Sequence, residues 1–525
     1  MNEAATQQRP RYGGLLFIVL LSVAGLVAVV RFGFTPFGGG PSRSIKAIIL
    51  LGNVAAYAWI RKYSRLRRSG QVAAVVVILL LQLSVRAAIR IDGFMGDGRP
   101  IVAWSWEPTA DDVFASEHRK LATTAGPSLD RDSLVRADWV GFRNKDRSGR
   151  IDDVLIARDV KANAPVELWR RPVGRGWSAF IVVGDRCITQ EQRGESEVVV
   201  CYNVLTGDEL WVHADQIAFR EVTGGDGPRA TPASDGERVV ALGATGLLNC
   251  LNLEDGTKHW SVQLSMPPRE ELVFGAAGSP LILEQTVIVT PGGEGNAMVA
   301  LDLQTGNELW AVGDSTIGYS SPHYANFNCG PQLLTFGSTG IVGHDPKTGS
   351  VLWSAPFGER STEFVNVCQP VPLTTRDRDR VLISAGYGRG CEMLELTSDG
   401  NSVRATTLWK NLKLKSKFAS IVTSGNYAYG LDERILTCID LESGERLWKG
   451  GRYGHGQLIL VGDTLLVLAE NGDVVLVEAS SAAFNELSRF KALESRTWTH
   501  PVLAGSLLLV RNDREAVCYA IKMRK

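Results

Sequence analysis

A repeated strand ending constrains the fold of this chain more than any other sequence feature. In each copy a short apolar strand meets an acidic or amide residue, then a Thr/Ser/Asp-Gly turn, and then a tryptophan. The clearest copy runs from Ala300 through Asp302, Thr305 and Gly306 to Trp310. Successive endings fall at residues 169, 211, 260, 310, 353, 409, 448 and 487, with degenerate copies at Trp409 and Leu487. Spacings of this size predict four-stranded propeller blades.

Each residue of the motif has a mechanical role. The Asp or Asn side chain can bond the turn backbone, the glycine accepts a positive φ, and the tryptophan covers the neighbouring blade. Between the motifs the pattern has period two and is rich in Val, Leu and Ile, which excludes helical repeats. The predicted blade-docking residues are Trp169, Trp211, Trp260, Trp310, Trp353, Trp409 and Trp448.

A second row of residues marks the opposite end of each blade. A proline follows a polar residue at Thr231-Pro232, Ser279-Pro280, Ser321-Pro322, Gln369-Pro370 and His500-Pro501. Proline suits the innermost strand, whose free edge faces the central channel. The last unit, from Thr497 to Lys525, lacks an outer strand, and Pro165 to Trp169 can supply it. We therefore predict an all-β, eight-bladed propeller that is closed by its two ends over residues 138–525.

The first 90 residues have a different composition, with three apolar runs at Gly13–Val30, Ala47–Ile60 and Gln71–Val85. We expect a membrane anchor of about three transmembrane helices. Five cations lie between Arg61 and Arg68, so the positive-inside rule places that loop and the N-terminus in the cytoplasm. One or three crossings would put the propeller on the periplasmic side of a bacterial inner membrane, and two would not. Residues 91–137 are expected to form a linker, with a short helix near Ala110 to Thr123.

The repeat resembles the tryptophan-docking repeat of pyrroloquinoline-quinone (PQQ) propellers. The segment Asp138-Trp139-Val140-Gly141-Phe142-Arg143-Asn144 looks like the lead-in of PQQ-like repeat proteins of planctomycete-type bacteria. This resemblance implies two classes of function, because the repeat occurs in quinoprotein dehydrogenases and in the non-catalytic propeller lipoprotein of the outer-membrane barrel assembly machinery.

Several features separate the two classes. Alcohol-type quinoproteins carry an adjacent cysteine pair and long inserted loops, whereas the eight cysteines here are never adjacent and the units are short. We therefore expect a membrane-anchored, non-catalytic binding or scaffolding platform with a protein partner and no cofactor. The alternative is a membrane-bound dehydrogenase that uses PQQ with Ca²⁺ to oxidise a sugar or alcohol and passes electrons to quinone. The equal numbers of basic and acidic residues, 56 each, argue against nucleic acid as a partner, and we expect a monomer.

Propeller geometry groups the residues that precede each innermost strand around one channel mouth. The candidate binding residues are Trp177, Arg229, Tyr319, Glu363, Lys417, His455 and Trp498. Aromatic and cationic side chains suit a flat anionic quinone or a peptide, and the alternative is that they only fill and solvate the mouth. No zinc, haem, P-loop or nucleophile-elbow motif occurs, so no catalytic, cofactor-binding or metal-binding residue is predicted. Cys368 and Cys391 share a blade, and whether they pair is left open.

Overall fold

The computed structural model describes residues 17–22, 24–25, 40–63, 67–118, 134–268, 271–314, 318–358, 366–400 and 402–524. The chain divides into two compact units. The first comprises Met1–Pro108 with Val222–Gly224, and the second comprises Thr109–Glu221 with Gly225–Lys525.

The first unit contains two long helices and a hairpin. Helix α2 spans Gly40–Tyr63, α3 spans Arg68–Ala88, and strands β1 (Ile89–Phe94) and β2 (Pro100–Trp104) pair in antiparallel fashion. Asn53 of α2 and Gln82 of α3 exchange amide hydrogen bonds of 3.1 and 2.6 Å. Among the described residues, α3 is the one helix that is long and apolar enough to cross a membrane. Most of the run Gly13–Val30 lies outside the described residues, but 17–22 and 24–25 are helical.

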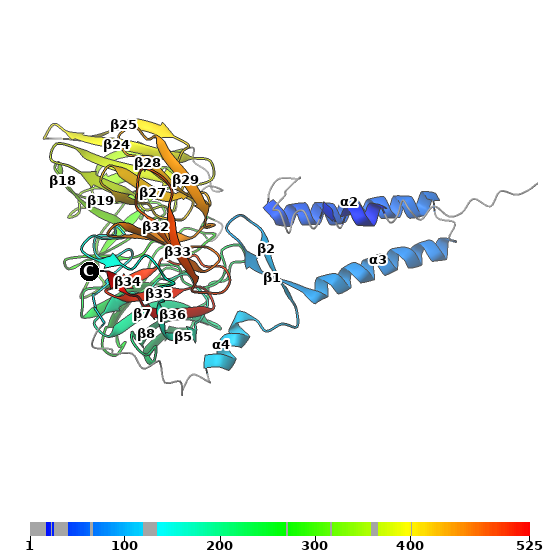
Figure 1. Cartoon of the computed structure of the whole chain (residues 1–525). Helices are drawn as coiled ribbons and strands as arrows, with labels where there is room; N and C mark the ends of the chain where they lie inside the picture. The colour runs from blue at the N-terminus through cyan, green and yellow to red at the C-terminus, as the bar shows by residue number, and fades with distance from the viewer. Residues whose placement is uncertain are drawn as a thin grey trace, which may run out of the picture. The chain divides into compact units, whose positions relative to one another are not determined.

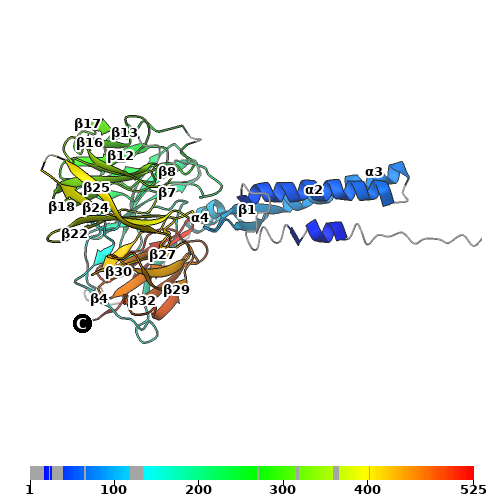
Figure 2. The ribbon, with the colours of Figure 1, turned by 90° about the horizontal axis from the view of Figure 1, so that it is seen from above.

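The second unit is an eight-bladed propeller, as the repeat predicts (Figures 1 and 2). Blade 1 consists of β6 (Ile181–Val183), β7 (Arg186–Arg193), β8 (Ser196–Asn203) and β9 (Glu209–Asp215). Blade 2 consists of β10 (Ala233–Ser234), β11 (Arg238–Leu242), β12 (Leu247–Asn252) and β13 (Lys258–Gln263). Blade 3 consists of β14 (Leu281–Leu283), β15 (Thr286–Val289), β16 (Met298–Asp302) and β17 (Glu308–Val312). Blade 4 consists of β18 (His323–Phe327), β19 (Gly330–Gly337), β20 (Gly340–His344) and β21 (Val351–Pro356).

The later blades repeat the same antiparallel order. Blade 5 consists of β22 (Val371–Thr374), β23 (Asp379–Ala385), β24 (Gly390–Ser398) and β25 (Val403–Asn411). Blade 6 consists of β26 (Val422–Ser424), β27 (Tyr427–Asp432), β28 (Ile435–Asp440) and β29 (Arg446–Arg452). Blade 7 consists of β30 (Gln457–Val461), β31 (Thr464–Leu468), β32 (Asp473–Glu478) and β33 (Glu486–Lys491), and β3 (Arg150–Ile151) adds to its inner edge in parallel.

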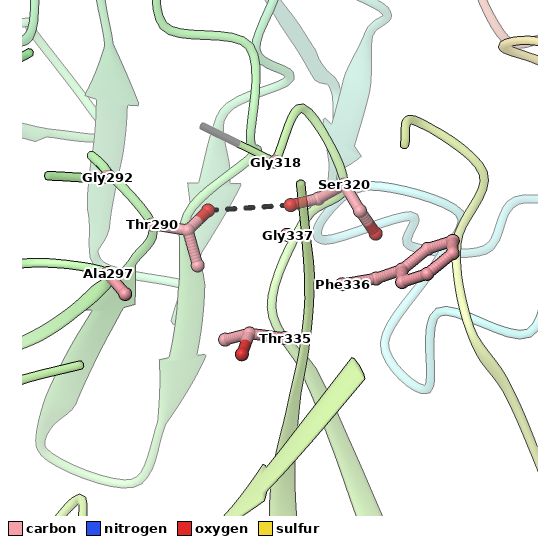
Figure 3. Close-up of a pocket in the computed structure, with 8 residues that line it drawn as sticks. All are labelled: Thr290, Gly292, Ala297, Gly318, Ser320, Thr335, Phe336 and Gly337. Atoms are coloured by element: carbon pink, nitrogen blue, oxygen red, sulfur yellow. Dashed lines mark hydrogen bonds between the residues drawn. The ribbon is translucent and has the colours of Figure 1, made fainter. Parts of the chain in front are cut away.

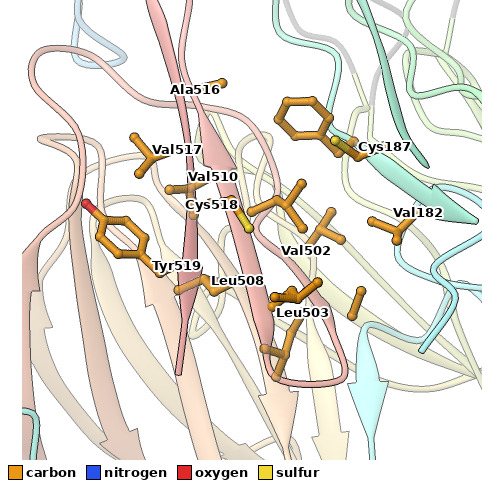
Figure 4. Packing of buried hydrophobic residues seen from close by; sticks show 14 of the residues in the cluster. Val182, Cys187, Val502, Leu503, Leu508, Val510, Ala516, Val517, Cys518 and Tyr519 are labelled. Atoms are coloured by element: carbon orange, nitrogen blue, oxygen red, sulfur yellow. The ribbon is translucent and has the colours of Figure 1, made fainter. Parts of the chain in front are cut away.

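Blade 8 closes the ring with strands from both ends of the propeller. It joins β34 (Val502–Ala504), β35 (Leu507–Arg511) and β36 (Glu515–Ala520) to the early strand β5 (Val166–Pro172), with Trp169 opposite Cys518. A further pair, β37 (Met523–Arg524) with β4 (Leu155–Ile156), fastens the C-terminus to the same early segment. Figure 4 shows Cys518 and Val502 of blade 8 beside Val182 and Cys187 of blade 1, in one apolar cluster. Closure therefore removes free sheet edges and buries a continuous core.

A docking belt joins most neighbouring blades; we use this name for the repeat tryptophans together with the turn glycines they cover. The indole Nε1 of Trp169 donates to Val204 O of blade 1, and Trp260 Nε1 donates to Leu303 O of blade 3, at 2.8 and 2.9 Å. The indole also lies on the turn glycine, so a Cβ added at Gly306 would lie 2.7 Å from the Trp260 ring. Equivalent carbonyl contacts are made by Trp211, Trp409 and Trp448.

Trp353 differs from the rest of the docking belt. Its Nε1 donates to Gln332 Oε1 of its own blade, at 2.6 Å. Blade 5 follows it with a longer outer hairpin, in which Gly400 has open space around its Cα. Trp353 still contributes to the contact between blades 4 and 5, in one buried cluster with Phe327, Phe357 and Ile383.

The residue opposite most docking tryptophans is small, and the exception is Met393 opposite Trp409. Cys201, Cys250, Cys438 and Cys518 lie directly across the strand pair from Trp211, Trp260, Trp448 and Trp169. Ala300 and Gly343 occupy the same position opposite Trp310 and Trp353. At Gly343 an added Cβ would collide with the Trp353 indole, whereas the small cysteine and alanine side chains in the other blades pack beside their indoles without a clash.

Candidate functional site

The propeller axis is occupied by a loop from the N-terminal lead-in, Phe142–Gly149, which we call the axial plug. The segment enters beside blades 1 and 2, where Trp139 pairs with Val182 and Ser234 N donates to Val140 O. It leaves beside blade 7 through the pairing of Ile151 with Val461. Between these two points Arg147 reaches the lead-ins of blades 3 and 4, Arg143 reaches that of blade 6, and the Phe142 ring packs edge-on against His500 ahead of blade 8. The loop therefore lies in the channel that these segments surround.

Two arginines fix the axial plug to the innermost strands. Arg147 donates from Nη1 to Ser279 O at 3.1 Å and to Pro322 O at 2.8 Å, and from Nη2 to Pro280 O, so it ties blade 3 to blade 4. Arg143 donates from Nη2 to Ile421 O ahead of blade 6 at 2.7 Å. Both side chains are buried, which lowers the pKa of Arg147 to about 9 and that of Arg143 to about 10.

The axial plug is held in an unfavourable backbone conformation. Arg143, Asn144 and Arg147 have φ values of 58°, 74° and 58°, which L-residues seldom adopt. Such geometry costs about 1 to 2 kcal/mol per residue and persists only where surrounding contacts over-determine it. Here the carbonyls of blades 3, 4 and 6 supply those contacts.

The hydroxyl residues before three of the innermost-strand prolines connect neighbouring blades, from blade 1 to blade 4. Thr231 Oγ1 accepts from Ala179 N at 3.3 Å, Ser279 Oγ accepts from Thr231 N at 2.9 Å, and Ser321 Oγ accepts from Ser279 N at 2.9 Å. The row that the sequence shows as hydroxyl-proline pairs is therefore a chain of hydrogen bonds around the channel. It satisfies backbone groups that have no ladder partner at the inner edge.

The described mouth residues gather into an aromatic and cationic rim. The rings of Trp177 and Trp498 lie 4.8 Å apart, and the Arg496 guanidinium lies 4.8 and 4.5 Å from their centroids. Phe418 continues the rim, with its centroid 5.2 Å from those of both His455 and Trp498. We call Trp177, Trp498, Phe418, Tyr387 and their cations the mouth rim.

The other predicted mouth residues extend this arrangement. The ammonium of Lys417 lies 4.7 Å from the Tyr387 ring, and Arg229 lies 4.9 Å from the Phe219 ring. Tyr319 packs edge-on against Phe274, with the ring centroids 5.6 Å apart, and its hydroxyl accepts from Phe274 N at 3.2 Å. Burial raises the pKa of Tyr387 to about 12. Glu363 lies outside the described residues.

Burial divides the mouth residues into two groups. Trp177, Tyr319 and His455 are only 8%, 6% and 3% exposed, so they mainly fill the mouth. Trp498, Phe418, Tyr387 and Lys417 are half-buried and reach the surface. Glu470 orients this exposed part, because its Oε1 accepts from Trp498 Nε1 at 2.8 Å and its Oε2 accepts from His455 N at 3.2 Å.

The expected linker contains an element that belongs to the propeller unit. Helix α4 (Ala110–His118) begins with a reciprocal cap, in which Thr109 Oγ1 accepts from Asp112 N at 3.1 Å and Thr109 N donates to Asp112 Oδ2 at 2.8 Å. Asp111 pairs with Arg175 at 3.0 Å, and Arg193 lies 5.1 Å from the Phe114 ring. Residues after His118, up to 133, lie outside the described part.

A small cavity between blades 3 and 4 has no features of a ligand site. Thr290, Ser320 and Phe336 line it with glycines, and Thr290 Oγ1 donates to Ser320 O at 3.4 Å (Figure 3). Its volume of about 10 Å³ has room for roughly one water molecule.

The described residues also do not fit PQQ with Ca²⁺ on the axis. A flat polyanionic quinone needs a chamber there, but the guanidinium groups of Arg143 and Arg147 fill that space and are bonded to backbone carbonyls. Within the described ranges, no group of three or more His, Cys, Asp or Glu residues could hold a metal ion. All eight cysteines are free, including Cys368 and Cys391, and burial raises the pKa of both to about 12.

The closed ring of four-stranded blades and the tryptophan docking belt are those of a PQQ-type propeller. The chain belongs to the PQQ_2 family, described as "Outer membrane protein assembly factor BamB", which matches residues 160–450. A protein of that name from Yersinia pestis is 21% identical over 294 residues, which are 53% of this chain and 66% of that protein. Another from Burkholderia pseudomallei is 22% identical over 358 residues, which are 66% of this chain and 84% of that protein.

Solved structures share the fold at low sequence identity. A europium-containing methanol dehydrogenase superposes with a TM-score of 0.58 at 11% identity, covering 73% of this chain and 98% of that one. BamB from Moraxella catarrhalis superposes with a TM-score of 0.50 at 17% identity, covering 68% and 98%. Similarity at this level concerns the fold, and the chemistry has to be argued from the site.

The sequence suggested the mouth residues as candidates but contained no sign of the axial plug. Arg143 stood in the quoted lead-in, yet nothing in its spacing indicates that the segment enters the channel. It also missed Tyr387 and Phe418 as rim residues, because they lie outside the positions that repeat from blade to blade.

Proposed function

We propose that this protein is a non-catalytic binding platform that presents the mouth rim to a protein partner. The observation that carries this proposal is the axial plug, because a filled axis leaves the exposed aromatic and cationic side chains at the mouth as the available recognition surface. Half-buried aromatic side chains beside cations are typical anchors of protein interfaces. Membership of the BamB family supports this class of function.

We further propose that the first unit anchors the chain in an inner membrane, with the propeller on the periplasmic side. Supporting this placement, Val77, Leu80 and Leu83 of α3 are more than half exposed, which suits contact with lipid. The cations Arg61 and Lys62 in the last turn of α2 favour the cytoplasmic side for that end. Fusing alkaline phosphatase after Lys525 tests this topology, and activity of a cytoplasm-specific reporter there would contradict it.

The second candidate is a PQQ-dependent dehydrogenase, which the methanol dehydrogenase fold favours. The two candidates differ in a direct assay of the purified chain supplied with PQQ and Ca²⁺. We expect no dye-linked oxidation of glucose or of short alcohols. Turnover that disappears on chelation and returns with Ca²⁺ would establish the enzyme instead.

A photo-crosslinking experiment tests the platform itself. Replacing Phe418 with a photoreactive phenylalanine analogue places the probe in the mouth rim, whereas the same replacement at Leu309, 54% exposed on the outer strand of blade 3, serves as a matched control. We expect a discrete adduct in cells from position 418 and none from position 309. Absence of an adduct from 418, or equal adducts from both positions, would contradict the use of the mouth.

A further inference from the structure

One side of the mouth carries an unusual concentration of positive charge. Lys415, Arg446 and Lys449 surround Asp432, and we call these four residues the blade 6 cationic cluster. Lys415 Nζ lies 2.6 Å from Asp432 Oδ1, Arg446 Nη2 lies 3.0 Å from Oδ2, and Lys449 Nζ also contacts Oδ2. Asp432 is 1% exposed, while the three cationic side chains are 21%, 32% and 29% exposed. The buried carboxylate thus holds three cations at the surface.

The charges in this cluster do not balance. One carboxylate faces three cations, which leaves two positive charges within one hydrogen-bonded group. The nearby cations keep the pKa of Asp432 below its usual value, so the carboxylate stays ionised. Three cations gathered around one anion repel one another, and a stabilising ion pair would need only one of them. The arrangement is therefore better suited to receiving a further anion than to stabilising the blade.

The cluster is continuous with the aromatic part of the mouth rim. The segment from Lys413 to Phe418 contains Lys415 of the cluster and then Lys417, whose ammonium lies 4.7 Å from the Tyr387 ring and 5.9 Å from the Phe418 ring. Phe418 in turn packs edge-on against Trp498. A ligand that spans this segment would meet the cations first and the aromatic faces next, beside the carboxylate of Glu433, whose Oε1 accepts from Tyr387 N at 3.1 Å.

The other cations around the mouth do not show this excess. Arg496 pairs with Asp513 at 3.2 Å and is 2% exposed, and Arg229 faces Glu221 at 4.0 Å with 9% of its side chain exposed. Arg175 pairs with Asp111 and Asp226 at 3.0 and 3.2 Å. The charge asymmetry is therefore a local property of blade 6, in a chain whose total charge is zero.

We propose that the blade 6 cationic cluster and the adjoining aromatic rim recognise an extended acidic peptide segment of the partner. Its carboxylates would pair with Lys415, Arg446 and Lys449, and a neighbouring aromatic or aliphatic side chain would pack against Phe418 and Trp498. Lysine and arginine donate several hydrogen bonds each, so each cation can serve Asp432 and a second carboxylate together. This inference rests on the proposed platform function and specifies the chemistry of its partner.

Fluorescence anisotropy with labelled peptides tests the proposal on the full-length protein in detergent. The acidic probe carries glutamates around one phenylalanine, and the matched probe has glutamine in place of each glutamate. We expect the acidic probe to bind at least about tenfold more tightly at low salt, because two or three partly exposed ion pairs supply about 0.5 to 1 kcal/mol each. The difference should shrink as salt is raised. Equal affinity of the two probes would overturn the proposal.

Two variants that should change the affinity for the acidic probe in opposite directions distinguish an electrostatic effect from damage to the fold. The double variant Lys415→Gln/Lys449→Gln should weaken binding of the acidic probe by about fivefold or more. Asp432→Asn adds one net positive charge and should strengthen it by about twofold to fivefold, an effect that partial unfolding would not produce. The control Lys258→Gln/Lys347→Gln removes the same charge from exposed positions in blades 2 and 4 and should leave binding unchanged. Weaker binding by Asp432→Asn, or equal losses in the control, would refute the assignment.

The outcomes also separate this inference from the proposed function. If the crosslink at position 418 forms but the acidic probe does not compete with it, the platform stands and the acidic-peptide inference fails. If neither the crosslink nor probe binding is observed, both fail. A labelled single-stranded oligonucleotide that binds more tightly than the acidic peptide would also refute the inference, because the cluster would then bind phosphate groups in preference to carboxylates.

Discussion

The docking belt and the axial plug hold the same ring together in different ways. The belt repeats one apolar contact, an indole over a turn glycine, at successive blade boundaries. The plug uses two buried guanidinium groups, each placed once, to join carbonyls from several blades. The belt gains stability from apolar area that many residue types could supply, whereas the plug depends on directional hydrogen bonds at a single place.

The largest loss of stability is expected from a substitution in the docking belt. Trp260→Ala should lower the free energy of unfolding by about 3 to 5 kcal/mol, because it removes a buried indole and leaves a cavity between blades 2 and 3. Urea denaturation followed by circular dichroism measures this loss. Leu309→Ala, at a half-exposed position of the next blade, is the control and should change stability by well under about 1 kcal/mol. A Trp260→Ala loss as small as that of the control would mean that the belt contributes little.

Replacing a polar residue of the axial plug should lower the free energy of unfolding by an amount approaching that of the belt variant. Arg147→Met fills the space but leaves the carbonyls of Ser279, Pro280 and Pro322 without their donor, which should cost about 2 to 3 kcal/mol after relief of the buried charge is subtracted. The same urea measurement applies, and limited proteolysis between residues 138 and 151 should become faster. Unchanged stability together with unchanged proteolysis would show that the plug is dispensable.

The two regions should also respond differently to acid. His323 lies at the start of the innermost strand of blade 4, and burial together with Arg147 and Arg143 lowers its pKa to about 3. The unfolded chain therefore binds a proton near pH 6.5 that the folded chain does not, so stability falls as the pH drops below about 6.5. From pH 7 to 5 this group should cost about 2 kcal/mol.

Comparing the pH dependence of stability in the unmodified protein and in His323→Gln isolates the contribution of His323. His323→Gln should remove the corresponding part of the pH slope, whereas Glu197, whose pKa burial raises to about 7, contributes with the opposite sign in both proteins. The belt aspartates Asp302 and Asp345 have pKa values lowered by hydroxyl and backbone donors of their turns, so their contribution is lost only below about pH 4. Equal slopes between pH 5 and 7 in the two proteins would contradict the assignment to His323.

The smallest expected change is the difference in stability loss between alanine variants of two turn glycines. Gly306 and Gly400 both have positive φ, 73° and 87°, but a Cβ at Gly306 would contact the Trp260 ring while one at Gly400 meets nothing within 4 Å. Gly400→Ala should cost about 1 kcal/mol from backbone strain, and Gly306→Ala about 1 kcal/mol more from displacing the indole. Thermal unfolding of the two single variants measures the difference. Equal losses would mean that the indole can shift freely.

The blades and the docking belt could be predicted from the sequence because their contacts repeat along the chain. The pairing of Trp169 with the C-terminal strand and the count of eight blades are confirmed. The candidate mouth residues were chosen by the same logic, because a residue before an innermost strand should lie near the channel, and their binding role stays a prediction. Trp353 departs from the belt in bonding Gln332 of its own blade, next to the longer hairpin of blade 5. Trp448 also meets a turn without glycine, but its Nε1 keeps the carbonyl contact, to Ser480 O.

The sequence by itself determined the class of fold, the closure of the ring and the positions of the repeated contacts. The fold class and the repeated contacts follow from local spacing and apolar period, which survive in most copies, and the closure follows from the strand that the last unit lacks. Only the tertiary structure decided that Phe142–Gly149 fills the axis, that Lys415, Arg446 and Lys449 converge on Asp432, and that Tyr387 and Phe418 join the mouth rim. These contacts each occur once and join residues distant in the chain, so no period in the sequence records them.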